Sequence, residues 1–549
     1  MKTLSFLVLF FSLSLIIPVS VSAASTYYVS KSGNNEDGQS WQSAWNELNQ
    51  INWNIIQQGD TIVLDGGTTA CSYPVKITNI ANTPSPNNCG MLYSSTLNIA
   101  KSGTSSNPIT IKVSTDTGHN GTVRIFGGRT YPVPYLHQTD HPGNPSGTRS
   151  YGISVDQNTS NNNGWVTIDG SHWAGIMVYG HSSVGVTFEQ TNCGSNLPTG
   201  VTIRNLEIFD NGSRGIRPAG TDILFDNVMV HDNGQDSFQV DSITTNMTIR
   251  RSWLFNSRPN PQSPECPFNQ ADQDTGSSHS DGVQIYAGNG AHTGFKVEDS
   301  IIGPGHMHTF MLGDYNASNS CIGTTTVPGF TVKNSLLISD HCWASEDTVH
   351  TKSNDSVVQN NYVFDNISSI RDNNQRVQNI YHTRGTGHTV TDSLFVGGTT
   401  LTMSGSSTIS NNFCSAIADR YNICSNDTQN PSFRDPVFDG VWDDPLSADS
   451  SFAEFDFTIT NPAIPSGVGS SITSVATLLG KSSTPPPSSA PTYNTSDLEP
   501  DGDVDTEDFL TLVSNFGLTG ILGWIRSDIV KNGAIDIFDF NKLISNFGL

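Results

Sequence analysis

The sequence is poor in charged residues, and positive charge is especially scarce. Only 14% of the residues are Asp, Glu, Lys or Arg, and 26 Lys and Arg stand against 50 Asp and Glu, for a formal net charge of −24. Such a surface repels nucleic acid and bare anionic membranes, so neither is an expected partner. It would also repel a polyanionic substrate unless calcium or local basic residues bridged the two. Helical periodicity is scarce before residue 497, which argues against a helical bundle.

Long apolar runs are also missing, apart from one at the N-terminus. Lys2 precedes the apolar core Leu4 to Ile17, and the small residues Val21, Ser22 and Ala23 form a cleavage site. The pattern predicts a signal peptide over residues 1–23 and a secreted protein that does not insert into a membrane after cleavage. The alternative is an uncleaved anchor, although the apolar core is short for a membrane span.

Eight cysteines are present, and no pair has the CxxC spacing of zinc or redox sites. Export places them in an oxidising compartment, where disulfides persist. Cys71 with Cys89 and Cys414 with Cys424 are close enough in sequence to suggest local bridges. Cys321 with Cys342 is a weaker pairing, and Cys193 with Cys266 is what remains. Sequence alone leaves the connectivity open.

Short apolar segments recur between about residues 26 and 479, separated by Asn, Asp, Gly and Ser. VTIRNLEIFDN (from Val201), ILFDNVMVHDN (from Ile223) and FTVKNSLLISD (from Phe330) share one frame: apolar–x–apolar, a polar pair, then an apolar run. Such irregular repeats are typical of a right-handed parallel β-helix, an all-β solenoid in which each coil buries its apolar face against the next. A β-propeller is the alternative, but it expects more even spacing.

The polar residue at each bend is expected to stack with its equivalents in a ladder inside the coil. The predicted ladder consists of Asn205, Asn227, Ser252, Ser300, Ser335, Asn361 and Ser393. The segment from Ser25 to Leu48, followed by GDTIVLDGG, predicts a strand, a Gly-rich turn, a capping helix and the first coil. We therefore assign the β-helix to residues 24–480. The Pro- and Ser-rich residues 481–496 form a stiff linker.

Aligning the coils by their bends also aligns the polar residues that precede each bend. One column contains Arg214, Asp236, Asp281, His308 and Asp347, and the column three residues on contains Arg217, Gln239, Gln284, Met311, His350 and His382. Lys352 and Arg384 lie two residues further. Because side chains alternate along a strand, Phe238, Val283, Phe310 and Val349 are expected to point inward and the polar groups outward. The sequence thus predicts a strip of carboxylates beside a strip of His, Gln, Lys and Arg.

This strip has a functional and a structural interpretation. Several carboxylates at one place suit calcium, and a Lys beside a metal can have a lowered pKa and act as a general base. However, an Asp at the start of a coil often only caps a turn. The alignment is also sensitive, because a slip of one residue would move each side chain to the other face.

HSDGVQ (His279 to Gln284) and EDTVHTKSNDSVVQNNYVFDN (from Glu346) resemble secreted β-helix polysaccharide lyases of the pectate-lyase-like kind. The resemblance implies cleavage of an acidic polysaccharide, in which calcium neutralises the uronate carboxylate and a Lys or Arg removes the C5 proton. The implied metal ligands are Asp236, Asp281, Glu346 and Asp347. The implied base is Lys352 or Arg384, and His350 and Asp281 are further candidate catalytic residues. The candidate substrate-binding residues are Arg217, Gln239, Gln284, His308 and Tyr286. A glycoside hydrolase on this fold, or a glycan-binding or structural protein without catalysis, remains open.

The last 53 residues contain two copies of a calcium-loop pattern. A calcium loop places oxygen ligands at positions 1, 3, 5, 7, 9 and 12, with Gly at position 6. The first copy offers Asp497, Glu499, Asp501, Asp503, Asp505 and Asp508. The second offers Asp528, Asn532, Asp536 and Asp539. Val530 stands at position 3 of the second copy, so that site should be weaker.

A helical apolar pattern follows each loop, and Asp rather than Glu stands at position 12. This loop-then-helix form resembles the type I dockerin, so residues 497–549 are expected to form a small α-helical calcium-binding domain that docks to a cohesin-type partner. Dockerins choose the partner with loop positions 10 and 11, which here are Thr506 and Glu507 in the first copy and Ile537 and Phe538 in the second. Because these pairs differ, a symmetric dual binding mode is in doubt.

Overall fold

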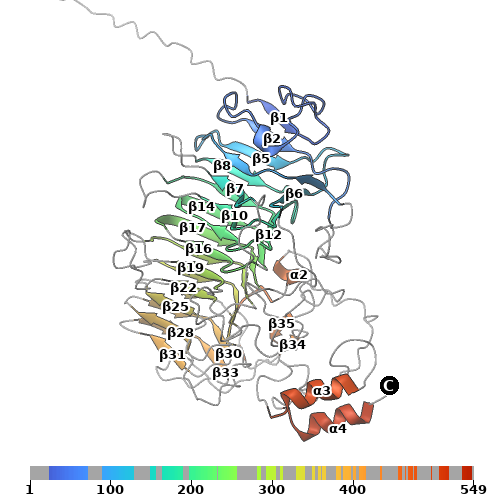
Figure 1. Cartoon of the computed structure of the whole chain (residues 1–549). Helices are drawn as coiled ribbons and strands as arrows, with labels where there is room; N and C mark the ends of the chain where they lie inside the picture. Colours follow the sequence, from blue (N-terminus) through green and yellow to red (C-terminus); the bar gives the residue numbers. More distant parts are fainter. Residues whose placement is uncertain are drawn as a thin grey trace, which may run out of the picture.

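A computed structural model gives the architecture of the chain (Figure 1). The residues that it describes are 24–71, 89–128, 149–155, 164–188, 197–231, 233–240, 242–255, 281–285, 292–303, 309–312, 329–339, 349–352, 357–359, 362–365, 379–384, 388–396, 400–403, 407–415, 433–435, 456–459, 464, 468–473, 475–478, 496, 506–517, 529 and 535–546. The predicted signal peptide lies outside these residues.

Three parallel sheets run along the solenoid, and we name them A, B and C. Sheet A is ordered β1 (Thr26–Val29), β2 (Thr61–Leu64), β5 (Ile109–Val113), β8 (Val166–Asp169), β11 (Thr202–Arg204), β14 (Gly220–Asp226), β17 (Thr244–Arg250), β20 (Lys296–Glu298), β23 (Thr331–Lys333), β26 (Val357–Gln359), β29 (His388–Thr391) and β32 (Ser407–Ser410).

Sheets B and C have the same construction. Sheet B is ordered β3 (Met91–Tyr93), β6 (Val123–Phe126), β9 (Ile176–Tyr179), β12 (Leu206–Phe209), β15 (Met229–His231), β18 (Trp253–Leu254), β21 (Ile301–Ile302), β24 (Leu336–Ser339), β27 (Tyr362–Asp365), β30 (Leu394–Val396) and β33 (Phe413–Ser415). Sheet C is ordered β4 (Leu97–Ile99), β7 (Tyr151–Val155), β10 (Val184–Thr187), β13 (Ile216–Arg217), β16 (Phe238–Val240), β19 (Val283–Ile285), β22 (Phe310–Leu312), β25 (Val349–Lys352), β28 (Asn379–Arg384) and β31 (Thr400–Met403).

β1 pairs with β2, and from β2 to β30 each strand pairs in parallel with the strand three places later in the chain, so one coil contributes one strand to each sheet. Figure 1 shows the strands stacked in chain order from blue to orange. This is a parallel β-helix, as the repeat frame predicts, and it excludes the antiparallel blades of a propeller. The right-handed sense expected from the sequence is the one that chain sterics favour for parallel crossovers.

The core is a set of aligned apolar columns inside the coils. In sheet A the inward column reads Ile62, Ile111, Ile168, Ile203, Phe225, Ile249, Val297, Val332 and Val390. β-branched side chains dominate because they have few χ1 rotamers to lose and pack well on a pleated surface. Phe225 makes edge contacts with Phe188 and Phe238, at ring-centroid distances of 6.1 and 5.1 Å. Aromatic contacts thus join sheets A and C across the interior.

The bend between sheets A and B contains two polar columns where the sequence predicts one. Ser252, Ser300 and Ser335 form the inner column: the backbone amide of Ser252 donates to Ser300 Oγ at 3.2 Å, and that of Ser300 to Ser335 Oγ at 3.3 Å. Asn205 and Asn227 instead lie one residue earlier, at φ values of 62° and 58°.

Asn227 Nδ2 donates to Asn205 Oδ1 at 2.6 Å, in a separate and partly exposed ladder. The predicted single ladder was therefore wrong for these two residues, because these bends share a left-handed position before the buried one. Asn205 and Asn227 occupy that position, as Arg251, Asp299 and Asn334 do in later coils. Ser393 belongs to the inner column, where its amide donates to Asn412 Oδ1 at 3.0 Å. Asn361 lies outside the described residues.

A further ladder, not expected from the sequence, lines the bend between sheets B and C. Asn211 Nδ2 donates to Asn233 Oδ1 at 2.9 Å, and Asn211 Oδ1 lies 2.9 Å from His181 Nδ1. Burial lowers the pKa of His181 to about 4, although the hydrogen bond to Asn211 opposes this shift. The imidazole is therefore neutral at physiological pH and serves as a polar spacer.

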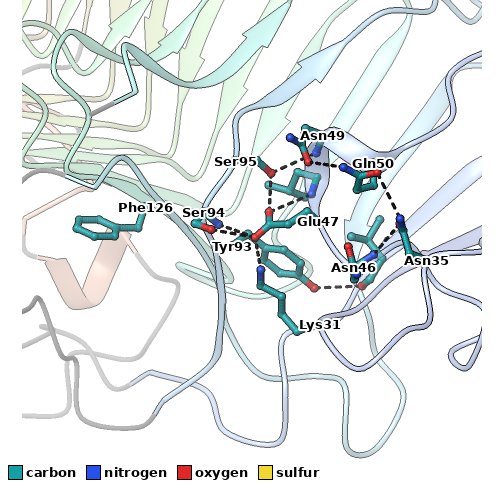
Figure 2. Close-up of polar contacts among 12 residues, drawn as sticks. Lys31, Asn35, Asn46, Glu47, Asn49, Gln50, Tyr93, Ser94, Ser95 and Phe126 are labelled. Atoms are coloured by element: carbon teal, nitrogen blue, oxygen red, sulfur yellow. Dashed lines mark hydrogen bonds and ion pairs between the residues drawn. The ribbon is translucent and has the colours of Figure 1, made fainter. Parts of the chain in front are cut away.

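The N-terminal end of the solenoid is closed by a cap that Figure 2 shows in detail. Where the sequence predicts a capping helix, the structure has a single 3₁₀ turn, η1 (Leu48–Gln50). Glu47 precedes this turn. Its carboxylate accepts hydrogen bonds from Lys31 Nζ, the Ser94 amide and the Ser95 hydroxyl. One carboxylate thereby joins the cap to the segment between β3 and β4.

Substituting Glu47 should weaken the cap in a pH-dependent way. Burial alone would raise the pKa of Glu47, but the hydrogen bonds from Lys31, Ser95 and Ser94 outweigh it and lower the pKa from 4.5 to about 2. Its stabilisation is therefore complete above about pH 4.5 and is lost as the pH falls toward 2. We expect Glu47→Gln to lower the free energy of unfolding by about 1–2 kcal/mol at neutral pH, since the group is partly solvated.

The measurement is the unfolding free energy of wild type and variant from pH 7 to pH 2. The difference between them should shrink below pH 4.5. Glu36→Gln, at an exposed position, is the matched control. A difference that stays constant down to pH 2 would contradict the assignment.

The disulfide Cys71–Cys89 is present, with a Cα–Cα distance of 5.0 Å, and this predicted pairing is confirmed. The other suggested pairings involve residues outside the described part of the chain. Two antiparallel strands, β34 (Phe433–Asp435) and β35 (Asp456–Ile459), and helix α2 (Val475–Leu478) follow the coils. The amide of Ser471, just before α2, donates to Asn334 Oδ1 at 2.7 Å and so contacts the bend between sheets A and B.

The C-terminal part contains α3 (Thr506–Asn515) and α4 (Ile537–Asn546). Leu512, Ile529, Ile535 and Leu543 form their shared core, and the rings of Phe509 and Phe540 meet at 5.9 Å. None of the helices in the described ranges is long and apolar enough to cross a membrane.

Candidate functional site

The polar columns predicted from the sequence lie on sheet C. Phe238, Val283, Phe310 and Val349 are Cα partners on β16, β19, β22 and β25, and the first three are fully buried in the core. The residues that follow them are also partners: Gln239 with Gln284, Gln284 with Met311, Met311 with His350, and His350 with His382. The strand register is therefore the predicted one.

Lys352 and Arg384 are Cα partners at the ends of β25 and β28. Strands in adjacent coils are ~4.8 Å apart, so two basic residues occupy neighbouring positions at one edge of sheet C. His350 and His382 form the equivalent pair two residues earlier. For β25 and β28 the structure describes the backbone, and the register alone places these four residues together.

The two glutamines and two aspartates differ from the expected solvent-facing strip, because all four are buried. Gln239 and Gln284 alternate with core residues and so face away from the core, yet only 2% and 1% of their surface is exposed. Gln239 Oε1 has no hydrogen-bond partner among the described residues. A buried carbonyl without a donor is costly, so it is a place where a water or a ligand hydroxyl would be stabilised.

Asp236 has a structural task that is visible in its contacts. Its Oδ1 accepts the backbone amide of Asp281 at 2.8 Å, and its own carbonyl accepts the amide of Gly215 at 3.1 Å. The Ser237 amide donates to the Asp281 carbonyl at 3.0 Å. Asp236 therefore holds the start of its strand against the start of the strand in the next coil. This is the structural interpretation of the Asp column, in which an Asp caps a turn. Asp281 lies on the adjacent coil and is fully buried.

The remaining predicted site residues are not brought together in the described part of the chain. His308, Tyr286, Glu346 and Asp347 lie outside it, and Arg217 is partly exposed at the end of β13. No three His, Cys, Asp or Glu side chains of the described residues converge as a metal site would require.

A second polar cluster, which sequence reasoning missed, lies on the outer face of sheet B. Glu207 Oε1 is 3.1 Å from His231 Nε2, and both side chains are at most 2% exposed. Burial raises the pKa of Tyr179, while the neighbouring Arg124 guanidinium opposes this shift. Arg124, Tyr179, Glu207 and His231 come from four consecutive strands, β6, β9, β12 and β15.

The His231 ring also belongs to an aromatic stack. Its centroid lies 5.2 Å from that of Phe209 and 4.7 Å from that of Phe255, and Phe209 in turn stacks on Tyr179 at 4.9 Å. The signal for this cluster was available in EIFDN and MVHDN, where Glu207 and His231 occupy outward positions beside aromatic residues. A polar pair between stacked rings on a covered face has little access to solvent.

In the C-terminal part, α3 and α4 begin at position 10 of the two predicted loops. The amide of Asp536 donates to Asp539 Oδ2 at 2.9 Å, and the amide of Phe538 donates to Asp536 Oδ1 at 2.7 Å. Two carboxylates thus meet at the N-terminus of α4, and Asp539 is fully buried. They supply oxygen donors suited to calcium. The loop residues 497–505, 528 and 532 lie outside the described residues, as does the side chain of Asp508.

No protein-family model matches the chain, and no curated protein matches it. Solved structures do match. The pectate lyase Pel9A is 13% identical over 81% of this chain and 91% of its own, with a TM-score of 0.38. A rhamnogalacturonan lyase is 14% identical over 83% and 98%, with a TM-score of 0.37. An alginate lyase from Paenibacillus sp. str. FPU-7 is 14% identical over 70% and 96%, with a TM-score of 0.30.

A lacto-N-biosidase and a mannuronan C-5 epimerase module match in the same way. At these identities and TM-scores the structural similarity does not indicate which reaction, if any, this chain catalyses. The parallel β-helix is established by the strand pairing itself.

Proposed function

We propose that this protein is a secreted polysaccharide lyase that cleaves an acidic polysaccharide by β-elimination and is tethered through its C-terminal domain. The observation that supports the proposal most is the pairing of Lys352 with Arg384 and of His350 with His382 on adjacent strands of sheet C. Basic residues repeated on neighbouring coils can contact successive sugar units of one polymer chain. Gln239 and Gln284 continue the same column as buried residues.

In the proposed reaction, Lys352 or Arg384 removes the C5 proton of a uronate unit as the general base. The bond between C4 and the glycosidic oxygen breaks, a C4–C5 double bond forms, and a proton returns to the leaving oxygen. We assign the transfer of that proton to His350. Calcium, held by Asp281, Glu346 and Asp347 with Asp236 beside them, would neutralise the uronate carboxylate.

The decisive experiment follows the ultraviolet absorbance of the unsaturated product. The full chain is incubated with polygalacturonate, alginate or a glycosaminoglycan, each with calcium and with a chelator. A calcium-dependent rise on one polymer supports the lyase. No rise on any of them contradicts it.

A glycoside hydrolase is the second candidate function. The placement of Asp236 and Asp281 on adjacent coils favours it, because carboxylates one coil apart approach the ~5 Å separation of retaining enzymes. New reducing ends without ultraviolet absorbance would support this candidate. Polymer binding without either product would point to a glycan-binding or structural β-helix.

For the C-terminal domain we infer calcium binding and attachment to a cohesin-type partner. Large apolar side chains are exposed on both helices: Leu510, Val513 and Phe516 in the α3 part, and Ile537, Phe538 and Ile544 in α4. Exposed apolar groups on so small a domain are typical of a protein interface. Export through the N-terminal signal would bring the protein to such a partner outside the cell.

The two loops should bind calcium unequally. Asp508→Ala removes the position-12 carboxylate of the complete first loop and should abolish the tighter of two binding phases in a calcium titration of the full chain. Asp539→Ala should remove only the weaker phase, because Val530 already costs that loop one ligand. We expect the two sites of wild type to differ by about tenfold or more in affinity.

Asp222→Ala, an exposed carboxylate of the β-helix, is the control and should leave both phases intact. Two equal phases in wild type would contradict the assignment of unequal loops.

A further inference from the structure

The outer face of sheet A contains a column of charges that alternate in sign. Its members are Cα partners on seven consecutive strands from β5 to β23: Lys112, Asp169, Arg204, Asp226, Arg250, Glu298 and Lys333. They lie on the face opposite the inward Ile and Val column. Opposite charges on neighbouring strands attract, so the column also helps to fix the register.

The two signs are not equally accessible. Arg204, Arg250 and Arg251 are 46%, 40% and 54% exposed at the side chain, whereas Asp169 and Asp226 are only 11% and 5% exposed. Arg251 Nε and Nη2 donate to the two oxygens of Asp226 at 2.8 and 2.6 Å. Asp169 and Asp226 thus lie beneath the guanidinium groups, whereas Glu298 is partly exposed, as Lys112 and Lys333 are.

Lys296 adds a further exposed cation to this face. Asp222 and Asp299 are the carboxylates at its two edges, one exposed and one partly exposed. In a chain with a net charge of −24, a face on which the exposed side chains are mainly cationic is exceptional. Electrostatic complementarity therefore favours an anionic partner here.

A second column beside the charges consists mainly of threonine. Thr110, Thr167, Thr202, Leu224, Thr248, Lys296 and Thr331 are Cα partners on the same seven strands. All are at least partly exposed. The hydroxyl groups can donate and accept hydrogen bonds at five of the seven coils, which lie ~4.8 Å apart. The face is therefore flat, polar and periodic.

We propose that this face of sheet A binds a linear anionic polysaccharide laid along the solenoid axis, at a distance from the sheet C site. The cationic positions recur every second coil, ~9.6 Å apart, which suits a polymer with repeated and widely spaced carboxylates. The threonine hydroxyls pair with the hydroxyl groups that such a polymer carries between its charges. The assignment rests on the proposed function for the class of polymer and adds a second contact surface for it.

Nucleic acid fits the face less well. It carries one charge per ~1.7 Å of duplex, and the rest of this acidic protein would repel it. Single strands are bound on aromatic platforms, and the sheet A positions on these seven strands hold no exposed aromatic side chain.

The test measures binding of the full chain to polygalacturonate in chelator at low and high salt. Lys296→Gln combined with Lys333→Gln removes two cations for which no ion pair is present in the described residues. We expect this variant to bind about 5- to 10-fold more weakly at low salt, with the loss reduced at high salt. Lys101→Gln combined with Lys542→Gln changes the net charge equally outside the face and should bind as wild type does.

Thr331→Glu supplies an independent variant that removes no lysine and should also weaken binding. Both variants should melt at the wild-type temperature, since these side chains face solvent. Equal losses in the two double variants, or no binding by wild type, would overturn the assignment. So would tighter binding of duplex DNA or anionic vesicles through the same residues.

The result is separable from that of the proposed function. Binding that depends on Lys296 and Lys333 without any unsaturated product supports the sheet A surface and contradicts the lyase. If unsaturated product forms and binding does not depend on either lysine, the lyase is supported and the sheet A surface is overturned.

Discussion

Lys352→Ala should lower the rate of unsaturated-product formation by about 10²- to 10⁴-fold, the range that a positioned general base contributes. Lys352 is the basic residue at the end of β25, and Arg384 is its Cα partner on β28. If Lys352 takes the C5 proton, its ammonium must lose a proton first. A guanidinium does so far less readily, because arginine remains protonated in proteins.

Lys352→Arg therefore separates the two roles open to this residue. A base is lost in both Lys352→Ala and Lys352→Arg, whereas a residue that only neutralises substrate charge is largely replaced by Arg. The pH profile adds a second criterion, because a lysine base produces a rise in rate through its own pKa. The measurement is the initial rate with polymer at saturating calcium.

Lys101→Ala is the matched control, since it removes a lysine from the bend after β4 and should keep the full rate. Arg384→Ala should lose the rate as well, through substrate binding if Lys352 is the base. Retention of the rate in Lys352→Ala together with its loss in Arg384→Ala would assign the base to Arg384. Retention in both would contradict the sheet C site.

The register of sheet C was predictable because its inward residues repeat without interruption. Phe238, Val283, Phe310 and Val349 are bulky and apolar, and each is followed by a polar residue or Met. A slip of one residue in the coils of Phe238, Val283 or Val349 would turn a polar side chain into the core and a large apolar one out of it. The same argument explains why Lys352 and Arg384 could be paired from the sequence.

The burial of Gln239 and Gln284 could not be predicted, because exposure depends on what lies over a strand rather than on the strand. The alternation of side chains along the strand shows only that these two side chains point away from the core. The prediction of a single bend ladder was wrong for a local reason. Asn205 occupies the left-handed backbone position of its bend, whereas Ser252 occupies the buried position that follows it. Both residue types suit a bend, and only the backbone distinguishes them.

The polar cluster of sheet B is the converse case: Glu207 and His231 are visible in the sequence as outward polar residues, but the sequence does not show that they contact each other. Glu207 is the Cα partner of Met229, and His231 lies two residues further along that strand, so the two are not directly opposite each other. The structure brings them together diagonally, at 3.1 Å. Diagonal neighbours on adjacent strands are within reach of long side chains, and this geometry is hard to select from sequence alone.

His231→Phe should lower the free energy of unfolding by about 3 kcal/mol. Phenylalanine keeps the ring stack with Phe209 and Phe255 but removes the nitrogen that meets Glu207 Oε1. Within the described part of the chain Glu207 Oε2 has no hydrogen-bond partner, so the variant removes the one hydrogen bond that this part supplies to the buried carboxylate. Removing one member of a buried polar pair leaves the full desolvation cost of the other.

The double variant Glu207→Met with His231→Phe should recover most of that loss. Met177 and Met229 are the Cα partners of Glu207 on the two neighbouring strands, so a methionine extends an existing apolar column. Replacing a buried polar pair by packed apolar side chains is often neutral or stabilising. Chemical denaturation of the wild type, both single variants and the double variant completes the cycle. Additive losses would show that the two side chains stabilise the fold independently, and would contradict the pair.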